Sequence, residues 1–198
     1  MRFKKKCSFA LNNYKMNLNI IKSVMMKKVI FLLIILASGL YSFGQKATVK
    51  WYTIQEAEKL AKADPKPMIV DTYTDWCGWC KRLDSDTFSN PVIADILNSK
   101  FYPVKFDAEG KQPVTFQGRT FINDGKSGPS HQLAIALLQG QMSYPNLVFF
   151  NENTQLLTNV PGYLPPKEME VLLSFFATKA YDNQKFQDFQ KSFKGKVE

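Results

Sequence analysis

A Cys-x-x-Cys pair placed directly after a β-rich apolar run is the feature that most constrains this chain. The run covers residues 68–74, and Cys77 and Cys80 follow at the predicted start of an amphipathic helix. Two thiols at this spacing can close a small, reversible disulfide, and a helix N-terminus favours the thiolate of the first one. The sequence therefore indicates a strand–turn–helix unit suited to thiol–disulfide chemistry.

Half of a zinc site is the alternative use of two cysteines at this spacing. A structural zinc ion takes about four ligands, mostly Cys and His. Besides the pair, the chain has only Cys7 and one histidine, His131. Because Cys7 lies in an N-terminal segment that we expect to be removed, we predict no metal and no cofactor. His131 has no partner motif and is predicted to be structural.

Residues 1–44 have the pattern of a leader with a signal peptide. Lys27-Lys28 precedes an apolar run over residues 29–37, and Ser42 and Gly44 stand at the minus-three and minus-one positions of a cut before Gln45. We expect cleavage there and a periplasmic or secreted protein. An uncleaved membrane anchor is the alternative, although the run is short for a membrane span.

The basic charge of the chain is concentrated in this leader. Residues 1–44 hold 8 of the 26 Lys and Arg and no acid, which leaves 18 basic against 17 acidic residues and a net charge of +1 for residues 45–198. The basic character is therefore no evidence for nucleic acid, and we expect no nucleic-acid partner. The excess of lysine before Met25 favours a true start at Met25 or Met26, with a long basic leader as the alternative.

Helical periodicity, capping signals and β-rich runs predict alternating helices and strands. Thr53 and Glu56 form a capping box, and Asn90-Pro91 opens a second helix. Strands are expected at 68–74, 101–107, 146–150 and 155–160, and helices at 51–63, from Cys77, from Pro91, at 130–139, 166–180 and 184–193. Between Ala108 and Gln141 a hairpin is expected at 114–121. Strands joined through helices should pair in parallel and the last two as a hairpin, in a mixed sheet covered on both faces.

Together these features resemble the thioredoxin superfamily over about residues 51–180. The likeness is strongest to the C-terminal thioredoxin-like domain of the bacterial transmembrane thiol:disulfide interchange reductase and to small exported proteins. It is carried by residues 71–81, 87–92, Pro145 before a strand, and Gly162 after the last strand. The resemblance implies a thioredoxin-like three-layer α/β/α sandwich with a mixed central sheet. Residues 45–198 would form this domain, with an insertion at about 108–141.

The resemblance also implies roles for three residues. Cys77 would attack a substrate disulfide, and Cys80 would resolve the mixed disulfide. Asp71 lies six residues before Cys77 on a strand expected to be buried. There its raised pKa would let it accept the proton of Cys80. A solvated aspartate is the alternative for Asp71.

Five further residues are expected to contact the substrate. Trp76, Gly78 and Trp79 would shape the rim of the site. Pro145 matches the cis-proline of the family and would expose the backbone of Tyr144 for strand-like pairing with a substrate. A trans proline on the surface is the alternative.

Two charged residues are expected to modulate the pair. Asp84 follows Cys77 by seven residues and Cys80 by four, so a helix would place all three on one face, where a carboxylate opposes thiolate formation. Lys105 falls where thioredoxins place a lysine near the buried acid. Solvated charges are the alternative for both residues.

The sequence thus predicts an exported thiol–disulfide oxidoreductase that reduces or exchanges disulfides of envelope proteins. Its partners would be protein thiols and disulfides together with an electron donor, for which a membrane reductase is one candidate. A disulfide-inserting oxidant and a non-catalytic client-binding module are the alternatives. Trp79 replaces the proline of the Gly-Pro dipeptide in ordinary thioredoxins, so the redox direction stays open.

Overall fold

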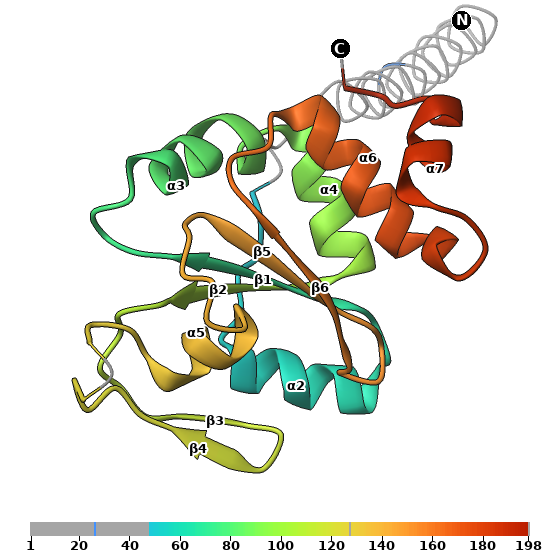
Figure 1. The fold of residues 1–198 in the computed structure, drawn as a ribbon. Helices are drawn as coiled ribbons and strands as arrows, with labels where there is room; N and C mark the ends of the chain where they lie inside the picture. Colours follow the sequence, from blue (N-terminus) through green and yellow to red (C-terminus); the bar gives the residue numbers. More distant parts are fainter. Residues whose placement is uncertain (1–25, 27–47, 127, 198) are drawn as a thin grey trace, which may run out of the picture. The chain divides into compact units, whose positions relative to one another are not determined.

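A mixed four-stranded sheet in the order β2–β1–β5–β6 forms the centre of the fold (Figure 1). The computed structural model describes residues 26, 48–126 and 128–197. The predicted leader, its cut before Gln45 and Cys7 lie outside these residues, with the exception of Met26. The strands of the sheet are β1 (Met68–Tyr73), β2 (Tyr102–Asp107), β5 (Asn146–Phe150) and β6 (Leu156–Pro161).

Helices cover both faces of this sheet and make three layers, as predicted (Figure 1). One face packs against α2 (Ile54–Ala63), α5 (Gln132–Leu137) and a separate hairpin of β3 (Val114–Phe116) and β4 (Arg119–Phe121). The other face packs against the segment that begins at α3 (Gly78–Arg82) and against two longer helices, α4 (Pro91–Lys100) and α6 (Pro166–Ala177). Two short helices, η2 (Ala180–Asp182) and α7 (Phe186–Ser192), follow α6.

Local capping explains where two of the helices begin. The Thr53 hydroxyl accepts a hydrogen bond from the Glu56 backbone at 3.2 Å, and the Thr53 backbone donates to the Glu56 carboxylate at 2.8 Å. Asn90 accepts from the Val92 backbone at 2.9 Å, with Pro91 in the first turn of α4. These contacts satisfy backbone donors that the first turn of a helix leaves free, so both predicted caps are confirmed. The first helix begins at Ile54, three residues after the predicted bound at Trp51.

The direction of β5 differs from the prediction. β1 and β2 are parallel, as expected, but β5 runs antiparallel to β1, with Asn146 opposite Thr72. The connection between β2 and β5 contains α5, which has six residues and is therefore about 9 Å long. A helix this short does not carry the chain back along the sheet. Strand β5 consequently starts at the edge where β1 and β2 end.

The helix expected from Cys77 also differs in form. The α-helical part, α3, has five residues and continues as a π-helical segment, η1 (Leu83–Phe88). A π-helix changes the angular spacing of side chains, so positions beyond Leu83 do not follow the α-helical face that the sequence suggested.

Alternation along β1 decides which side chain lies beneath this segment. Met68 and Val70 face the α2 layer, whereas Ile69 faces the α4 and α6 layer together with Leu147. Asp71 follows Ile69 by two residues and therefore lies on the same face as the layer that begins at α3.

Among the described residues, no helix combines the length and the apolar character that a membrane crossing needs.

Candidate active site

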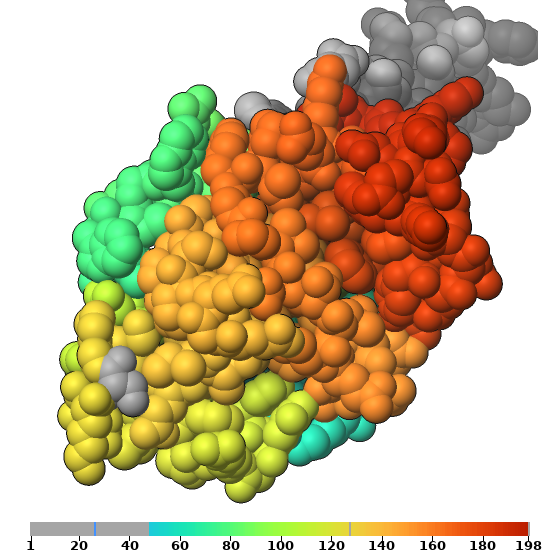
Figure 2. Space-filling view, in the orientation of Figure 1, coloured from blue at the N-terminus to red at the C-terminus, as the bar shows by residue number. Residues whose placement is uncertain are grey.

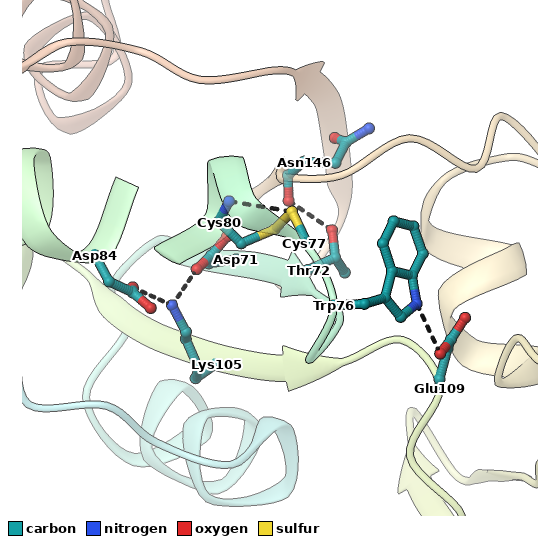
Figure 3. The surroundings of a disulfide bond; sticks show 9 residues. All are labelled: Asp71, Thr72, Trp76, Cys77, Cys80, Asp84, Lys105, Glu109 and Asn146. Atoms are coloured by element: carbon teal, nitrogen blue, oxygen red, sulfur yellow. Dashed lines mark hydrogen bonds and ion pairs between the residues drawn. A yellow bond between two sulfur atoms is a disulfide. The ribbon is translucent and has the colours of Figure 1, made fainter. Parts of the chain in front are cut away.

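Cys77 and Cys80 form a disulfide at the start of α3, with an S–S distance of 2.06 Å (Figure 3). Cys77 is the N-cap of α3, and its Sγ accepts a hydrogen bond from the Cys80 backbone N–H at 3.1 Å. Only 4% of Cys77 and 2% of Cys80 is exposed. The first sulfur therefore occupies the helix-start position that stabilises negative charge on it.

Asp71 is a buried acid on β1, and only one of its two carboxylate oxygens has a hydrogen-bond partner. Its exposed fraction is 1%, which excludes the solvated alternative. Oδ2 accepts from Lys105 Nζ at 2.6 Å, whereas Oδ1 is buried with no hydrogen-bond partner. Burial raises the pKa of Asp71 to about 6, against the attraction of Lys105, which lowers it. The site thus contains a carboxyl group that gains and loses a proton near neutral pH.

Lys105 links this buried acid to a second carboxylate, Asp84 (Figure 3). Its ammonium lies 5.0 to 5.3 Å from the centres of three aromatic rings, those of Trp51, Tyr73 and Phe88. Burial acts to lower the pKa of Lys105, but the two carboxylates outweigh it and the pKa is raised. Lys105 therefore stays charged, and neither Lys105 nor Asp84 is the isolated solvated charge that the sequence left open.

Trp76 and Trp79 are the most exposed aromatic side chains near the disulfide, at 67% and 56%. The Trp76 indole donates to the Glu109 carboxylate at 3.1 Å and meets the ring of Tyr144 edge-on, with centroids 6.0 Å apart. A Cβ added at Gly78 would contact nothing within 4 Å, so this residue faces open space. The predicted rim residues are thus accessible from solvent.

Pro145 follows a cis peptide bond, as the resemblance implied. Its carbonyl accepts from the Gly162 backbone at 2.8 Å, and the positive φ of Gly162, 97°, is one that side-chain-bearing residues rarely adopt. An open groove of about 340 Å³ lies here, lined by Trp79, Tyr144, Pro145, Gly162 and Tyr163. Trp79, one of the predicted rim residues, and Pro145 therefore line the same groove.

Several residues at the site carry no signal in a single sequence. The Thr72 hydroxyl donates to the Asn146 backbone carbonyl at 2.5 Å and joins β1 to the start of β5. Glu109 lies just after β2, and the Asn123 amide nitrogen holds the Glu109 carbonyl at 3.0 Å together with those of Gly110 and Pro129. Only contacts between distant segments reveal these roles.

His131 is buried and satisfied, in agreement with a structural role. Its Nδ1 accepts from the Leu133 backbone at 3.1 Å at the start of α5, and its Nε2 lies 3.1 Å from the Gln112 carbonyl. Over the part of the chain that the structure describes, no three His, Cys, Asp or Glu side chains gather in a way that could hold a metal ion.

Comparison with known proteins assigns the fold to a family. A family model described as a thioredoxin-like domain matches residues 54–177. The chain belongs to the thioredoxin-like family. The structure of a thioredoxin from Thermus thermophilus aligns over 67% of this chain and 89% of that chain with a TM-score of 0.51, and its 18% identity supports the fold alone.

Two curated relatives place this thioredoxin-like domain within much longer proteins. The thiol:disulfide interchange protein DsbD of Vibrio vulnificus is 30% identical over 149 residues, which is 64% of this chain and 22% of that protein. Spermatogenesis-associated protein 20 of Mus musculus is 29% identical over 103 residues, 52% of this chain and 13% of that protein. The chain thus spans less than a quarter of either relative.

Proposed function

We propose that this thioredoxin-like domain is a thiol–disulfide oxidoreductase that works through Cys77 and Cys80. The observation that carries the proposal is the position of their disulfide at the start of α3, in a domain that also buries the Asp71 carboxyl beneath the same layer. Two cysteines in this arrangement can alternate between dithiol and disulfide without rearranging the sheet.

In the reducing direction, the Cys77 thiolate attacks one sulfur of a client disulfide and the other client sulfur leaves as a thiolate. Cys80 then attacks the Cys77 sulfur of the mixed disulfide and releases the second client thiolate. Two electrons pass to the client, and Cys77 and Cys80 end as a disulfide. A protein dithiol must supply two electrons to restore the pair, and a membrane reductase is the donor we propose.

Asp71 is suited to help the second step. Cys80 must lose its proton before it attacks, and a group acts best as base when its pKa lies near the working pH. The pKa of Asp71 is raised by burial to about 6, and its Oδ1 has no competing donor. We therefore assign it the role of proton acceptor, with Lys105 holding Oδ2 at 2.6 Å.

Trapping distinguishes the attacking cysteine from the resolving one. The Cys80→Ala variant should accumulate mixed disulfides with client proteins through Cys77, because resolution is blocked. The matched Cys77→Ala variant should trap few client proteins. The adducts that it does form should be released only slowly, by added reductant. Adducts that form through Cys80 in the Cys77→Ala variant would reverse the assignment, and no exchange by the unmodified protein would favour a client-binding module.

The equilibrium reduction potential of the pair decides the direction. A value near that of thioredoxin, about −270 mV, favours a reductant, and one near about −120 mV favours a disulfide-inserting oxidant. The Gly78-Trp79 dipeptide differs from Gly-Pro and leaves the direction open. We propose the reducing or exchanging role because of the similarity to the thiol:disulfide interchange protein DsbD of Vibrio vulnificus.

The pattern of residues 1–44 supports a further proposal, that the domain works in the periplasm or after secretion. Mass spectrometry of the protein from the cell envelope should then give a chain that begins at Gln45. Retention of residues 27–44 would make the protein membrane-anchored instead.

A further inference from the structure

One side of the groove beside the disulfide is built by a cluster of four side chains that the redox steps do not use. These are Trp79, Arg82, Asp86 and Tyr163. Trp79 and Arg82 belong to α3, Asp86 to the π-helical segment η1, and Tyr163 to the segment after β6. The cluster therefore joins the cysteine-bearing helix to a part of the chain about eighty residues away, and Figure 2 shows the green surface of the first segment beside the orange surface of the second.

Asp86 holds this cluster together. Its Oδ2 accepts from Arg82 Nε at 3.0 Å and from the Tyr163 hydroxyl at 3.2 Å. Its Oδ1 is 3.3 Å from the Ser85 hydroxyl, which donates to it. One carboxylate thus fixes both the guanidinium and the phenol.

The guanidinium in turn lies against both rings. The central carbon of Arg82 is 5.5 Å from the ring centre of Trp79 and 5.4 Å from that of Tyr163. The two rings are themselves 5.5 Å apart, tilted by 42°. A planar cation beside two aromatic faces is a favourable arrangement. It ties the exposed ring of Trp79 to the half-buried ring of Tyr163, which packs against the core.

The groove beside these two rings is small, and uncharged residues line it. All five lining residues are uncharged, and the charges of Arg82 and Asp86, which do not line the groove, are paired with each other. A charged client side chain would lose water there without gaining a partner, whereas an aromatic ring could stack on Trp79 and Tyr163. About 340 Å³ accommodates one large side chain and no folded element.

We propose that Asp86 is a positioning residue that holds Trp79 through Arg82, and Tyr163 through both Arg82 and its own hydrogen bond. The two rings then form a wall that selects clients with an aromatic side chain next to the reactive cysteine. The occupant is an extended polypeptide segment whose disulfide meets Cys77 while its neighbouring aromatic ring enters the groove. This inference rests on the proposed function and names the client class for the same site.

Two peptides test the selection. Both carry the same disulfide, and the residues that flank the cysteine are Phe in one and Ala in the other. The unmodified domain should reduce the Phe peptide with the lower KM. The Asp86→Ala variant should raise the KM for the Phe peptide more than it lowers kcat, and the Phe-to-Ala ratio of kcat/KM should fall about three- to tenfold, the size of one or two lost cation–aromatic contacts.

Control variants separate positioning from a general structural effect. Asp95→Ala removes an exposed carboxylate from α4, outside the cluster, and should leave the ratio unchanged. Arg82→Lys keeps the charge but loses the planar contact with both rings, so it should lower the ratio. If Asp86 acts largely through Arg82, then Asp86→Ala should lower the ratio less in an Arg82→Ala background than in the unmodified domain, because only its hydrogen bond to Tyr163 is left to lose. Additive effects of the two substitutions would overturn the positioning role.

Binding without chemistry keeps this inference separate from the proposed function. The same peptides with serine in place of cysteine are titrated calorimetrically into the oxidised domain. Tighter binding of the Phe peptide, weakened by Asp86→Ala, supports the wall even if neither cysteine peptide is reduced. Equal binding of the Phe and Ala peptides overturns it, whereas a lack of exchange with both cysteine peptides overturns the proposed function alone.

Discussion

Replacing Asp71 by asparagine should stabilise the fold at neutral pH by an amount that the raised pKa sets. The pKa of this carboxyl is about 6 in the folded chain because of burial, against an ordinary value of 3.8. A difference of about two units between folded and unfolded states corresponds to about 3 kcal/mol at 1.36 kcal/mol for each unit. Asparagine keeps the volume and one acceptor for Lys105 but carries no charge.

The pH dependence follows from the sign of this shift. Because the folded-state pKa is above the unfolded one, the folded chain binds the proton more tightly. The contribution of Asp71 is therefore most favourable below pH 4 and is lost as the pH rises through about 6. The gain from Asp71→Asn should accordingly be small at pH 4, about 0.5 kcal/mol, and reach at most about 3 kcal/mol at pH 7. This value already includes the attraction of Lys105, which lowers the pKa of Asp71.

Denaturant unfolding of the oxidised protein between pH 4 and pH 8 measures this difference while the cysteines do not titrate. In parallel, stopped-flow exchange should show slower resolution by Cys80 in Asp71→Asn and a smaller effect on attack by Cys77. A stability difference that stays constant with pH would refute the linkage argument. A large loss of stability with unchanged resolution would make Asp71 a structural acid.

Two further substitutions have effects that the contacts define. Lys105→Met removes the cation that lowers the pKa of Asp71, so this pKa should rise above about 6 and the pH midpoint of mixed-disulfide resolution should move upward. NMR titration of the Asp71 carboxyl measures the pKa directly, and an unchanged value would contradict the ion pair. Gly195→Ala should destabilise the chain by about 1–3 kcal/mol in thermal unfolding, because a Cβ there would collide with the carboxylate of Glu170, which accepts from the Lys196 and Val197 backbones at 2.7 and 2.9 Å. A wild-type melting temperature for Gly195→Ala would show that the C-terminal segment is not held there.

The parts of the fold that the sequence predicts are those fixed by neighbouring residues. The capping box of Thr53 and Glu56 acts within one helical turn, and the hairpin turning at Gln117-Gly118 depends on residues that tolerate positive φ. The burial of Asp71 was also predictable, since it continues the apolar run of β1. In the first two cases the decisive contacts lie within a few residues along the chain, whereas for Asp71 the local apolar run predicts burial and the contact with Lys105, 34 residues away, does not follow from it.

The direction of β5 and the π-helical segment could not be predicted in this way. The length of a connection does not say how far its helix travels, and only the short extent of α5 explains why β5 starts beside the end of β1. Glu109 is a similar case, because its contact with Trp76 joins residues 33 positions apart. Asp86 has an α-helical spacing from Arg82, but its bond to Tyr163 depends on the fold as a whole.

The hydrogen bonds of the Asn123 side chain determine which part of this domain can vary in length. Its nitrogen holds the carbonyls of Glu109, Gly110 and Pro129 at 3.0, 3.1 and 2.7 Å. The long excursion between β2 and α5 is thereby divided into two smaller loops that close on a single residue. Because the cost of closing a loop grows slowly with its length, the loop between Asn123 and Pro129 could be exchanged for one of another size while Glu109 stays fixed beside Trp76. The other loop carries the β3–β4 hairpin, whose Phe116 and Phe121 are buried in the core. Asn123 therefore separates a part of the excursion that can vary in length from a part that the core holds in place.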